Sequence, residues 1–312
     1  MGRTLEDIGE LAAIARITRS LPTGRGIVKG AGDDCAVLRF PGDARYDWLL
    51  TSDPVIEGVH FTSATPAGRI GRKAVGRVLS DIAAMGGQPA WALLNIVAPR
   101  STPVARLDAL YAGASRLAAK HGLAIVGGDM ASGPVLEVHA FAVGAVPRGA
   151  AILRSGSRPG DLIFVTGRLG GSRKGHHLAF DPRMQEGAWL RGWARAMIDV
   201  SDGLASDLRH LTDMSGTGAR LELARIPVSR AAAALRDGLS PVQHALFDGE
   251  DFELLFTLPA RKRTAFLRAW QRAFALPCTW IGAMTGRAGR IECAQTDGTI
   301  RELNRAGYQH FA

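Results

Sequence analysis

Short acidic sequences recur along this chain, nearly always where an apolar strand or helix begins or ends. They read GDD, TSD, LSD, GGD, IDVSD and GED, and their carboxylates belong to Asp33, Asp34, Asp53, Asp81, Asp129, Asp199, Asp202, Glu250 and Asp251. Taken one at a time, each is an ordinary turn sequence. Gathered together they would repel one another, because like charges about 4 Å apart cost roughly 1 kcal/mol even in bulk water. Such a cluster is stable only with cations, and oxygen ligands suit Mg²⁺ or Ca²⁺.

Residues 30–61 hold two of these acidic sequences, and we expect the site to be centred there. Asp33 and Asp34 precede the strand-like residues 36–38, whereas Ser52 and Asp53 follow the strand-like residues 48–50. We interpret both acidic sequences as turns at strand ends. Turns at one edge of a sheet bring their side chains close together, so we expect the rest of the chain to supply further carboxylates to this place.

The sequence signatures of the common nucleotide-binding proteins are absent. There is no G-x-x-x-x-G-K-[ST], no HRD and DFG set, and no Rossmann G-x-G-x-x-G after a strand. The G-x-S-x-G of serine hydrolases and the histidine–acid spacing of zinc hydrolases are missing as well. A site with many acids and none of these motifs indicates phosphate chemistry run mainly by metal ions, because Mg²⁺ bridges polyphosphate to carboxylates and aligns donor with acceptor.

Strands and helices alternate along the chain, which predicts an α/β or α+β architecture in two halves. A segment rich in Gly, Ser, Arg and Pro at 148–159 is the expected boundary. Apolar periodicity predicts helices over 4–20, 68–87, 103–120 and 259–274, and strands over 91–97, 123–126, 135–146, 161–167 and 252–258. Ser201, between Asp199 and Asp202, is the expected N-cap of a further helix.

Asp81 and the histidine pair His176–His177 each admit a structural as well as a functional interpretation. Asp81 lies at the margin of the apolar stripe of its helix, where metal binding and an ion pair with Arg77 are equally favoured. His176 and His177 are adjacent and would point in different directions on a helix, so we expect surface or loop histidines and not a metal pair.

The bulk composition describes an ordinary globular protein without nucleic acid or membrane as partner. The chain has 312 residues, 46% of them hydrophobic and 21% charged, and a net charge of +9 carried by scattered arginines. Its N-terminal segment is an amphipathic helix containing acids, unlike a signal peptide, and no apolar run reaches the length of a membrane span. The three cysteines show no C-x-x-C spacing, which favours reduced thiols and a cytoplasmic protein.

Eight motifs that run in order over nearly the whole chain connect it with a known family. They are GDDCAVL, TSDPVIEGVHF, LSDIAAMGG, GGD, LRSGSRPGD, TGRLGGS, IDVSDGL and GEDFELLFT. With them the sequence resembles the thiamine-monophosphate kinase family, in the superfamily of aminoimidazole ribonucleotide synthetase. The resemblance implies a two-domain α/β (α+β) fold. Residues 1–150 would bind ATP and Mg²⁺ and form a barrel-like homodimer core, and residues 151–312 would form a C-terminal α/β domain on the substrate side.

The same resemblance implies roles for single residues. The positions expected to hold several Mg²⁺ ions are Asp33, Thr51, Ser52, Asp53, Asp81, Asp129, Asp199 and Asp202. The ones expected to be catalytic are Asp33, Asp53, Asp81, Asp129 and Asp202. ATP contacts are expected from Tyr111, Gly128, Asp129, Arg154 and Ser201, and contacts with thiamine monophosphate from His60, Glu250 and Tyr308.

The implied reaction passes the γ-phosphoryl group of ATP directly, in line, to the phosphate of thiamine monophosphate. That phosphate has a second pKa of about 6, so it is ionised near neutral pH and needs no general base. The chain departs from the family pattern at Val78, at Met130 and in a shortened segment at 172–183. Two alternatives therefore stay open: another ATP-dependent enzyme of the superfamily with a different acceptor, and a non-catalytic nucleotide or thiamine-phosphate binder.

Overall fold

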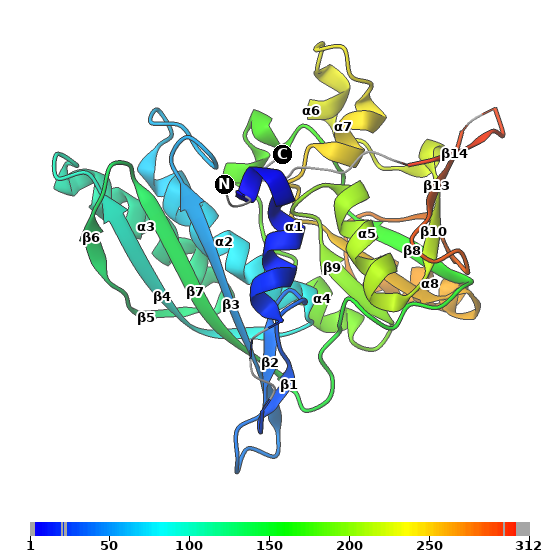
Figure 1. Ribbon diagram of the computed structural model, residues 1–312, viewed down its shortest axis with the longest axis horizontal. Helices are drawn as coiled ribbons and strands as arrows, with labels where there is room; N and C mark the ends of the chain where they lie inside the picture. The colour runs from blue at the N-terminus through cyan, green and yellow to red at the C-terminus, as the bar shows by residue number, and fades with distance from the viewer. Residues whose placement is uncertain (1–3, 20, 22–23, 296, 304–312) are drawn as a thin grey trace.

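Two seven-stranded sheets, one from each half of the chain, form the framework of the molecule (Figure 1). The computed structural model describes residues 4–19, 21, 24–295 and 297–303. The first sheet has the order β1-β2-β3-β7-β4-β5, with β6 beside β4. Its strands are β1 (Ile27–Lys29), β2 (Ala36–Leu38), β3 (Tyr46–Ile56), β4 (Gln88–Ala98), β5 (Ala124–Gly127), β6 (Met130–Ser132) and β7 (Glu137–Pro147).

The second sheet has the order β14-β13-β10-β12-β8-β11-β9. Its strands are β8 (Asp161–Thr166), β9 (Ala196–Asp199), β10 (Gly218–Glu222), β11 (Leu254–Pro259), β12 (Cys278–Thr285), β13 (Ile291–Ala294) and β14 (Ile300–Glu302). The helices are α1 (Leu5–Thr18), α2 (Ala67–Ala84), α3 (Val104–His121), α4 (Met184–Leu190), α5 (Leu204–Ser215), α6 (Arg230–Ala234), α7 (Pro241–Phe247) and α8 (Arg263–Ala273). The α/β architecture expected from the alternating pattern is thus confirmed, and its strands form two sheets.

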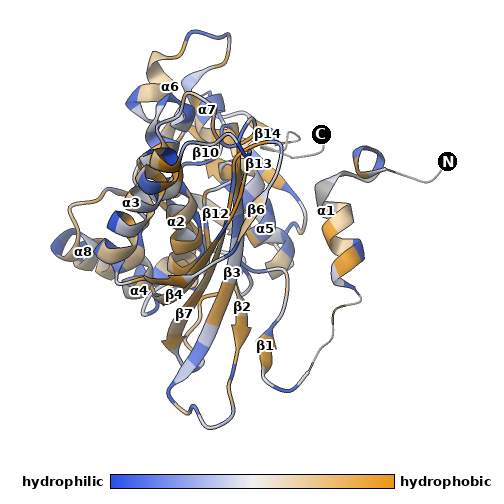
Figure 2. Ribbon diagram, turned by 90° about the vertical axis from the view of Figure 1, so that its left-hand side faces the viewer, coloured by the Kyte–Doolittle hydropathy of each residue, from blue (hydrophilic) through white to orange (hydrophobic). Residues whose placement is uncertain are grey.

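Helix α2 lies at the centre of this arrangement. Its apolar stripe, which includes Ile70, Val78 and Ile82, is fully buried, and the helix packs against α3, β3 and β7 of the first half. It also packs against α4 and β9 of the second half. In Figure 2, α2 and α3 lie on one side of the first sheet and α1 stands on the other. One helix therefore connects the two sheets.

Three details of the expected elements are wrong. Ser52 and Asp53 do not form a turn, because β3 continues through them to Ile56 and pairs with β7 along its whole length. Ser201 is not an N-cap: α5 begins after Gly203, which has no side chain to cap with. The helix expected from residue 259 begins only at Arg263, after a short 3₁₀ turn.

His176 and His177 lie in a second 3₁₀ turn, His176–Leu178. His177 Nδ1 lies 2.8 Å from the Ser172 carbonyl oxygen, and neither histidine belongs to a metal-competent group among the described residues. None of the described helices has the length and apolar character that crossing a membrane requires.

Glycines allow α2 and α3 to approach closely. A Cβ atom at Gly113 would lie 1.8 Å from the Gly68 carbonyl oxygen, and one at Gly71 would lie 2.0 Å from that of Leu110. Both distances are far below van der Waals contact, so each methyl group would have to push backbone apart. These glycines fix how deeply α2 sits under its neighbour and hence where its polar side chains lie.

Replacing Gly113 with alanine should lower the free energy of unfolding by about 1–3 kcal/mol, because the added methyl group overpacks the contact between the helices. Chemical denaturation followed by circular dichroism measures the change. Ser115→Ala, on the exposed side of the same helix, should stay within about 0.5 kcal/mol of the unmutated protein. Unchanged stability of Gly113→Ala would contradict this account of the packing.

Candidate functional site

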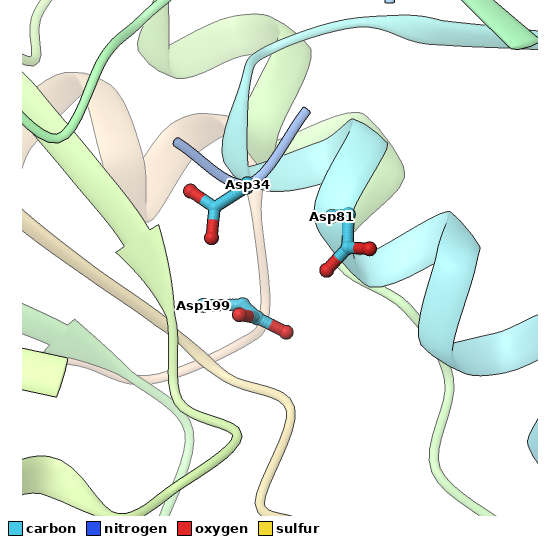
Figure 3. A group of neighbouring side chains, drawn as sticks. All are labelled: Asp34, Asp81 and Asp199. Carbon is cyan, nitrogen blue, oxygen red and sulfur yellow. The ribbon is translucent and has the colours of Figure 1, made fainter. Parts of the chain in front are cut away.

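Three aspartates from distant parts of the chain face one another between the two sheets. Asp34 precedes β2, Asp81 lies on α2 and Asp199 ends β9, and one carboxylate oxygen from each lies within 4.8 Å of the others (Figure 3). Asp34 and Asp199 are buried and Asp81 is half-buried. The structure therefore brings together acids of both halves, as expected for a metal centre.

Each of the three carboxylates receives a hydrogen bond from a neighbour. The Thr51 hydroxyl donates to Asp81, and the Ser80 hydroxyl donates to Asp199 Oδ2 at 2.5 Å. Arg154 donates to Asp34 Oδ1 from Nη2 at 2.7 Å and from Nε at 3.3 Å. Among the described residues, Arg154 is the one cation that donates a hydrogen bond to these three carboxylates.

Burial and mutual repulsion make these carboxyl groups hard to ionise. Burial, with the neighbouring charge of Asp34, raises the pKa of Asp199 to about 7. Burial, with the charges of Asp53 and Asp199, raises the pKa of Asp81 well above its ordinary value. The pKa of Asp34 is raised by burial as well, although Arg154 opposes the shift. The positive charge that the protein places near these carboxylates is therefore too small to offset their burial and mutual repulsion.

Unpartnered oxygens test whether a cation fits here. Asp33 Oδ2 and Asp34 Oδ2 are buried and accept no hydrogen bond from any described residue, although Lys29 Nζ lies 3.9 Å from Asp33 Oδ2. A buried carboxylate oxygen without a partner is costly. Mg²⁺ and Ca²⁺ prefer carboxylate and other oxygen ligands, so the donor set fits a hard divalent cation.

Asp33 lies beside the cluster and Asp34 lies within it. The sequence analysis named Asp33, and not Asp34, among the expected metal ligands. Asp33 Oδ1 accepts the backbone N–H of Arg154 at 3.0 Å. Burial and the charge of Asp34 raise the pKa of Asp33 to about 6. Two adjacent acids in an irregular turn give no periodic signal of which one points inward, so the choice between them needed the structure.

Asp53 and Glu250 lie near two cations of α2, Arg77 and Lys73. Arg77 Nη2 donates to Asp53 Oδ1 at 2.8 Å, and its Nη1 lies 3.6 Å from Glu250 Oε1. The expected alternative in which Arg77 pairs with Asp81 is therefore wrong. Lys73 Nζ lies 2.5 Å from the same Glu250 oxygen and donates to the His60 carbonyl oxygen at 2.8 Å.

Lys73 was missed by the sequence analysis, although a signal existed. It is fully buried, and burial lowers its pKa to about 8 despite the opposing charge of Glu250. Lys73, Arg77 and Asp81 are spaced four residues apart on α2, so they share one face of the helix. A basic residue in such a row, inside an otherwise apolar stripe, indicates a buried ion pair.

The residues expected to contact the substrate line two neighbouring hollows. His60, Arg77, Ser201, Asp202 and Glu250 line the first, a small hollow of about 30 Å³, together with Val59, Arg173 and Asp248. The second, of about 400 Å³, shares His60 and Glu250 with it. The structure thus brings His60 and Glu250 together with Ser201 and Asp202. Tyr308 lies outside the described residues.

Strained backbone holds Glu250 in this place. Glu250 and Phe252 have φ angles of 54° and 51°, in the left-handed region that side chains disfavour. Their backbone N–H groups donate to the carbonyl oxygens of Ser201 and Val200, at 2.7 and 2.8 Å. The segment is thereby fastened to the connection between β9 and α5, which carries Asp202.

Other expected site residues lie away from the cluster. Ser52 points to the exposed face of β3, opposite Thr51 and Asp53, because side chains alternate along a strand. Asp129 is exposed between β5 and β6 and accepts the Met130 backbone N–H at 2.8 Å. Tyr111 is exposed on α3, and Gly128 fits against the Leu94 carbonyl oxygen, which a Cβ atom would approach to 1.9 Å.

Mg²⁺ should raise the thermal midpoint more at about pH 8 than at about pH 5.5. A carboxyl group whose pKa is raised by folding adds stability below its ordinary pKa of about 4, and this contribution is lost as the pH rises through the folded value. For Asp33 and Asp199 the folded values are about 6 and about 7. The metal-free cluster is thus charged and destabilising above pH 7, whereas protons compete with the cation below pH 6.

Thermal denaturation with Mg²⁺ or with a chelator, at both pH values, measures this difference. Asp213→Asn, an exposed change on α5, serves as the control and should keep the full effect of Mg²⁺. An effect of equal size at both pH values, or one that persists in Asp199→Asn, would count against the cluster as the metal site.

Comparison with known proteins places the chain among its relatives. The family model "AIR synthase related protein, N-terminal domain" matches residues 32–146. The thiamine-monophosphate kinase of Escherichia coli (strain K12) is 35% identical over 329 aligned residues, which cover 97% of this chain and 98% of the relative. The thiamine-monophosphate kinase of Rhodopirellula baltica is 38% identical over 89% of each chain.

A solved structure agrees with these sequence matches. AaThiL complexed with AMPPCP and TMP shares 29% sequence identity and a TM-score of 0.87 with this chain, over 99% of both chains. The 35% sequence identity with the Escherichia coli relative, over 97% of this chain, shows that the chain belongs to the thiamine-monophosphate kinase family.

Proposed function

We propose that this protein transfers the γ-phosphoryl group of ATP to the phosphate of thiamine monophosphate, forming thiamine diphosphate and ADP. The observation that carries the proposal is the match over 99% of both chains to AaThiL complexed with AMPPCP and TMP. The site geometry supports it, because acids from both halves gather beside hollows lined by His60 and Glu250.

Several Mg²⁺ ions are the cofactor that these acids would hold. The close approach of Asp34, Asp81 and Asp199, with Asp33 beside them, supports this assignment. The family resemblance adds Thr51, Asp53 and Asp202 to the proposed ligands, and also Ser52 and Asp129, whose side chains lie away from the cluster. When bound, Mg²⁺ neutralises polyphosphate and weakens the repulsion between two anionic reactants.

The remaining work of the chain is to bind and align the two reactants. The acceptor phosphate is ionised at neutral pH, so we propose direct in-line transfer without a general base or a phosphoenzyme. The proposed ATP contacts are Tyr111, Gly128, Asp129, Arg154 and Ser201, and the proposed acceptor contacts are His60, Glu250 and Tyr308. Ser201 lies just before α5, where the free backbone N–H groups of a helix start favour phosphate.

The two halves are proposed to be two domains, residues 1–150 for ATP, Mg²⁺ and dimerisation, and residues 151–312 for the substrate side. This division is supported by the sheets, since β7 ends at Pro147 and β8 begins at Asp161. A cytoplasmic location is part of the proposal, because Cys35, Cys278 and Cys293 are all free.

The homodimer is proposed to form through the uncovered face of the first sheet. Leu50, Trp91, Leu93, Val126 and Phe141 are each between 38% and 61% exposed. They line one apolar hollow of about 600 Å³. Contiguous exposed apolar surface of this kind marks interaction sites. Two copies that face each other across this sheet would form the barrel-like core.

The catalytic proposal is tested by replacing Asp199. If the variant still melts cooperatively, it is folded, and a loss of activity cannot be attributed to unfolding. Unmutated protein with Mg-ATP and thiamine monophosphate should form thiamine diphosphate, separated by chromatography. Asp199→Asn should lower kcat by about a hundredfold or more, because it removes an expected metal ligand. Asp213→Asn, exposed on the neighbouring helix, should not change kcat.

Absence of thiamine diphosphate with the unmutated protein would refute the proposed acceptor. In a second arm, ATP labelled at its γ-phosphate is incubated with the protein alone. We expect no label on the chain, and a labelled chain would refute direct transfer.

The interface proposal is tested by Leu93→Lys, which places a charge in the middle of the uncovered sheet face. Analytical ultracentrifugation should find a dimer for the unmutated protein and a monomer for the variant, because an unpaired charge is costly in a buried interface. Val104→Lys, at the 72% exposed start of α3, should remain dimeric. A Leu93→Lys protein that remains dimeric would place the interface elsewhere.

A further inference from the structure

Arg77 lies where the acids of the two halves meet, and the reaction proposed above assigns it no role. It projects from α2 between Asp53 of the first sheet and Glu250 of the second half. Its side chain is 13% exposed and lines the same hollow as His60 and Ser201. An arginine in this position is either a structural link between two carboxylates or a group that binds an anion in the hollow.

The ion pairs around Arg77 do not need all of its donors. Glu250 already has a close partner in Lys73, at 2.5 Å, whereas Arg77 Nη1 is 3.6 Å away from it. Among the described residues, Arg77 makes one close hydrogen bond, from Nη2 to Asp53 at 2.8 Å. Arg77 Nε is buried and donates to no described residue. A guanidinium has five N–H donors in a planar fork, so most of this one's hydrogen-bonding capacity is unused.

Lys73 cannot take the same role. It is fully buried, and its ammonium group is engaged by Glu250 and by the His60 carbonyl oxygen. Lys73 is therefore a positioning residue, which holds Glu250 and the segment of His60 in place. This leaves Arg77 as the cation of α2 that reaches the hollow itself.

A phosphate group matches what Arg77 offers. Guanidinium groups bind phosphate oxygens in pairs, with strong charge-assisted hydrogen bonds. Asp53 is among the acids proposed to hold Mg²⁺, and a carboxylate engaged by a divalent cation attracts a guanidinium less strongly.

We infer that Arg77 is a further catalytic residue, which binds the phosphate group of the acceptor in the hollow shared with His60 and Glu250. This inference rests on the proposed function, since it assigns one contact to the acceptor that the function requires. The rest of the acceptor would be held by other residues of the two hollows, so Arg77 should distinguish a phosphorylated acceptor from the same molecule without its phosphate.

The test compares thiamine monophosphate with thiamine, which lacks the phosphate. Both are measured in the presence of Mg²⁺ and a non-hydrolysable ATP analogue, so that binding is read without turnover. Calorimetry gives the dissociation constant of thiamine monophosphate, and competition against it gives that of thiamine. Arg77→Gln should weaken binding of thiamine monophosphate by about ten- to a hundredfold, the usual effect of losing charge-assisted hydrogen bonds. Binding of thiamine should change by less than about twofold, since that ligand has no phosphate to lose.

Two further variants separate this role from a structural one. Arg77→Lys keeps the positive charge but loses the planar fork, so its affinity for thiamine monophosphate should lie between those of the unmutated protein and Arg77→Gln. Arg69→Gln removes an exposed arginine from the same helix and should leave both affinities unchanged.

The outcomes distinguish the inference from the function on which it rests. Equal weakening of both ligands would make Arg77 a structural link and overturn the inference, as would full affinity of Arg77→Gln for thiamine monophosphate. Thiamine monophosphate that does not bind to the unmutated protein would overturn the proposed function as well. Weakening confined to the phosphorylated ligand would support the inference.

Discussion

Three carboxylates within 4.8 Å of one another, two of them buried and one half-buried, are the main constraint on this molecule. Burial alone makes their ionisation unfavourable, and their mutual repulsion adds to the cost. The chain offsets part of it with hydrogen bonds from Thr51, Ser80 and Arg154. One oxygen each of Asp33 and Asp34 accepts no hydrogen bond from the described residues. The donor set of the cluster therefore fits a divalent cation, which would offset the repulsion between the acids.

The halves of the chain depend on each other for this site. Asp34 and Asp81 come from the first half and Asp199 from the second, and the Ser80–Asp199 hydrogen bond crosses between them. The ion pair of Lys73 with Glu250 crosses in the same direction. The site is therefore assembled only when the two sheets pack together. A change in the packing between the halves would move the acids relative to one another.

Periodicity predicts the elements well and the site only in outline. Helices α2 and α3 follow from long, unbroken apolar stripes, and most of the acids follow from their positions at the ends of such elements. Ser52 and Asp53 were misplaced because polar residues and Pro54 resemble a turn, whereas pairing with β7 keeps them in a strand. The contact of Asp34 with Arg154 and that of Lys73 with Glu250 join residues more than a hundred positions apart, for which the local sequence holds no signal.

The row formed by Lys73, Arg77 and Asp81 on α2 has a consequence for how such a chain can vary in length. Inserting or deleting one residue within this helix would rotate everything beyond it by about 100° and shift it by about 1.5 Å. Arg77 and Asp81 could then no longer face Asp53 and Asp199 together. Evolution can lengthen or shorten the surface loops of this protein, but the number of residues between Lys73 and Asp81 is fixed by geometry.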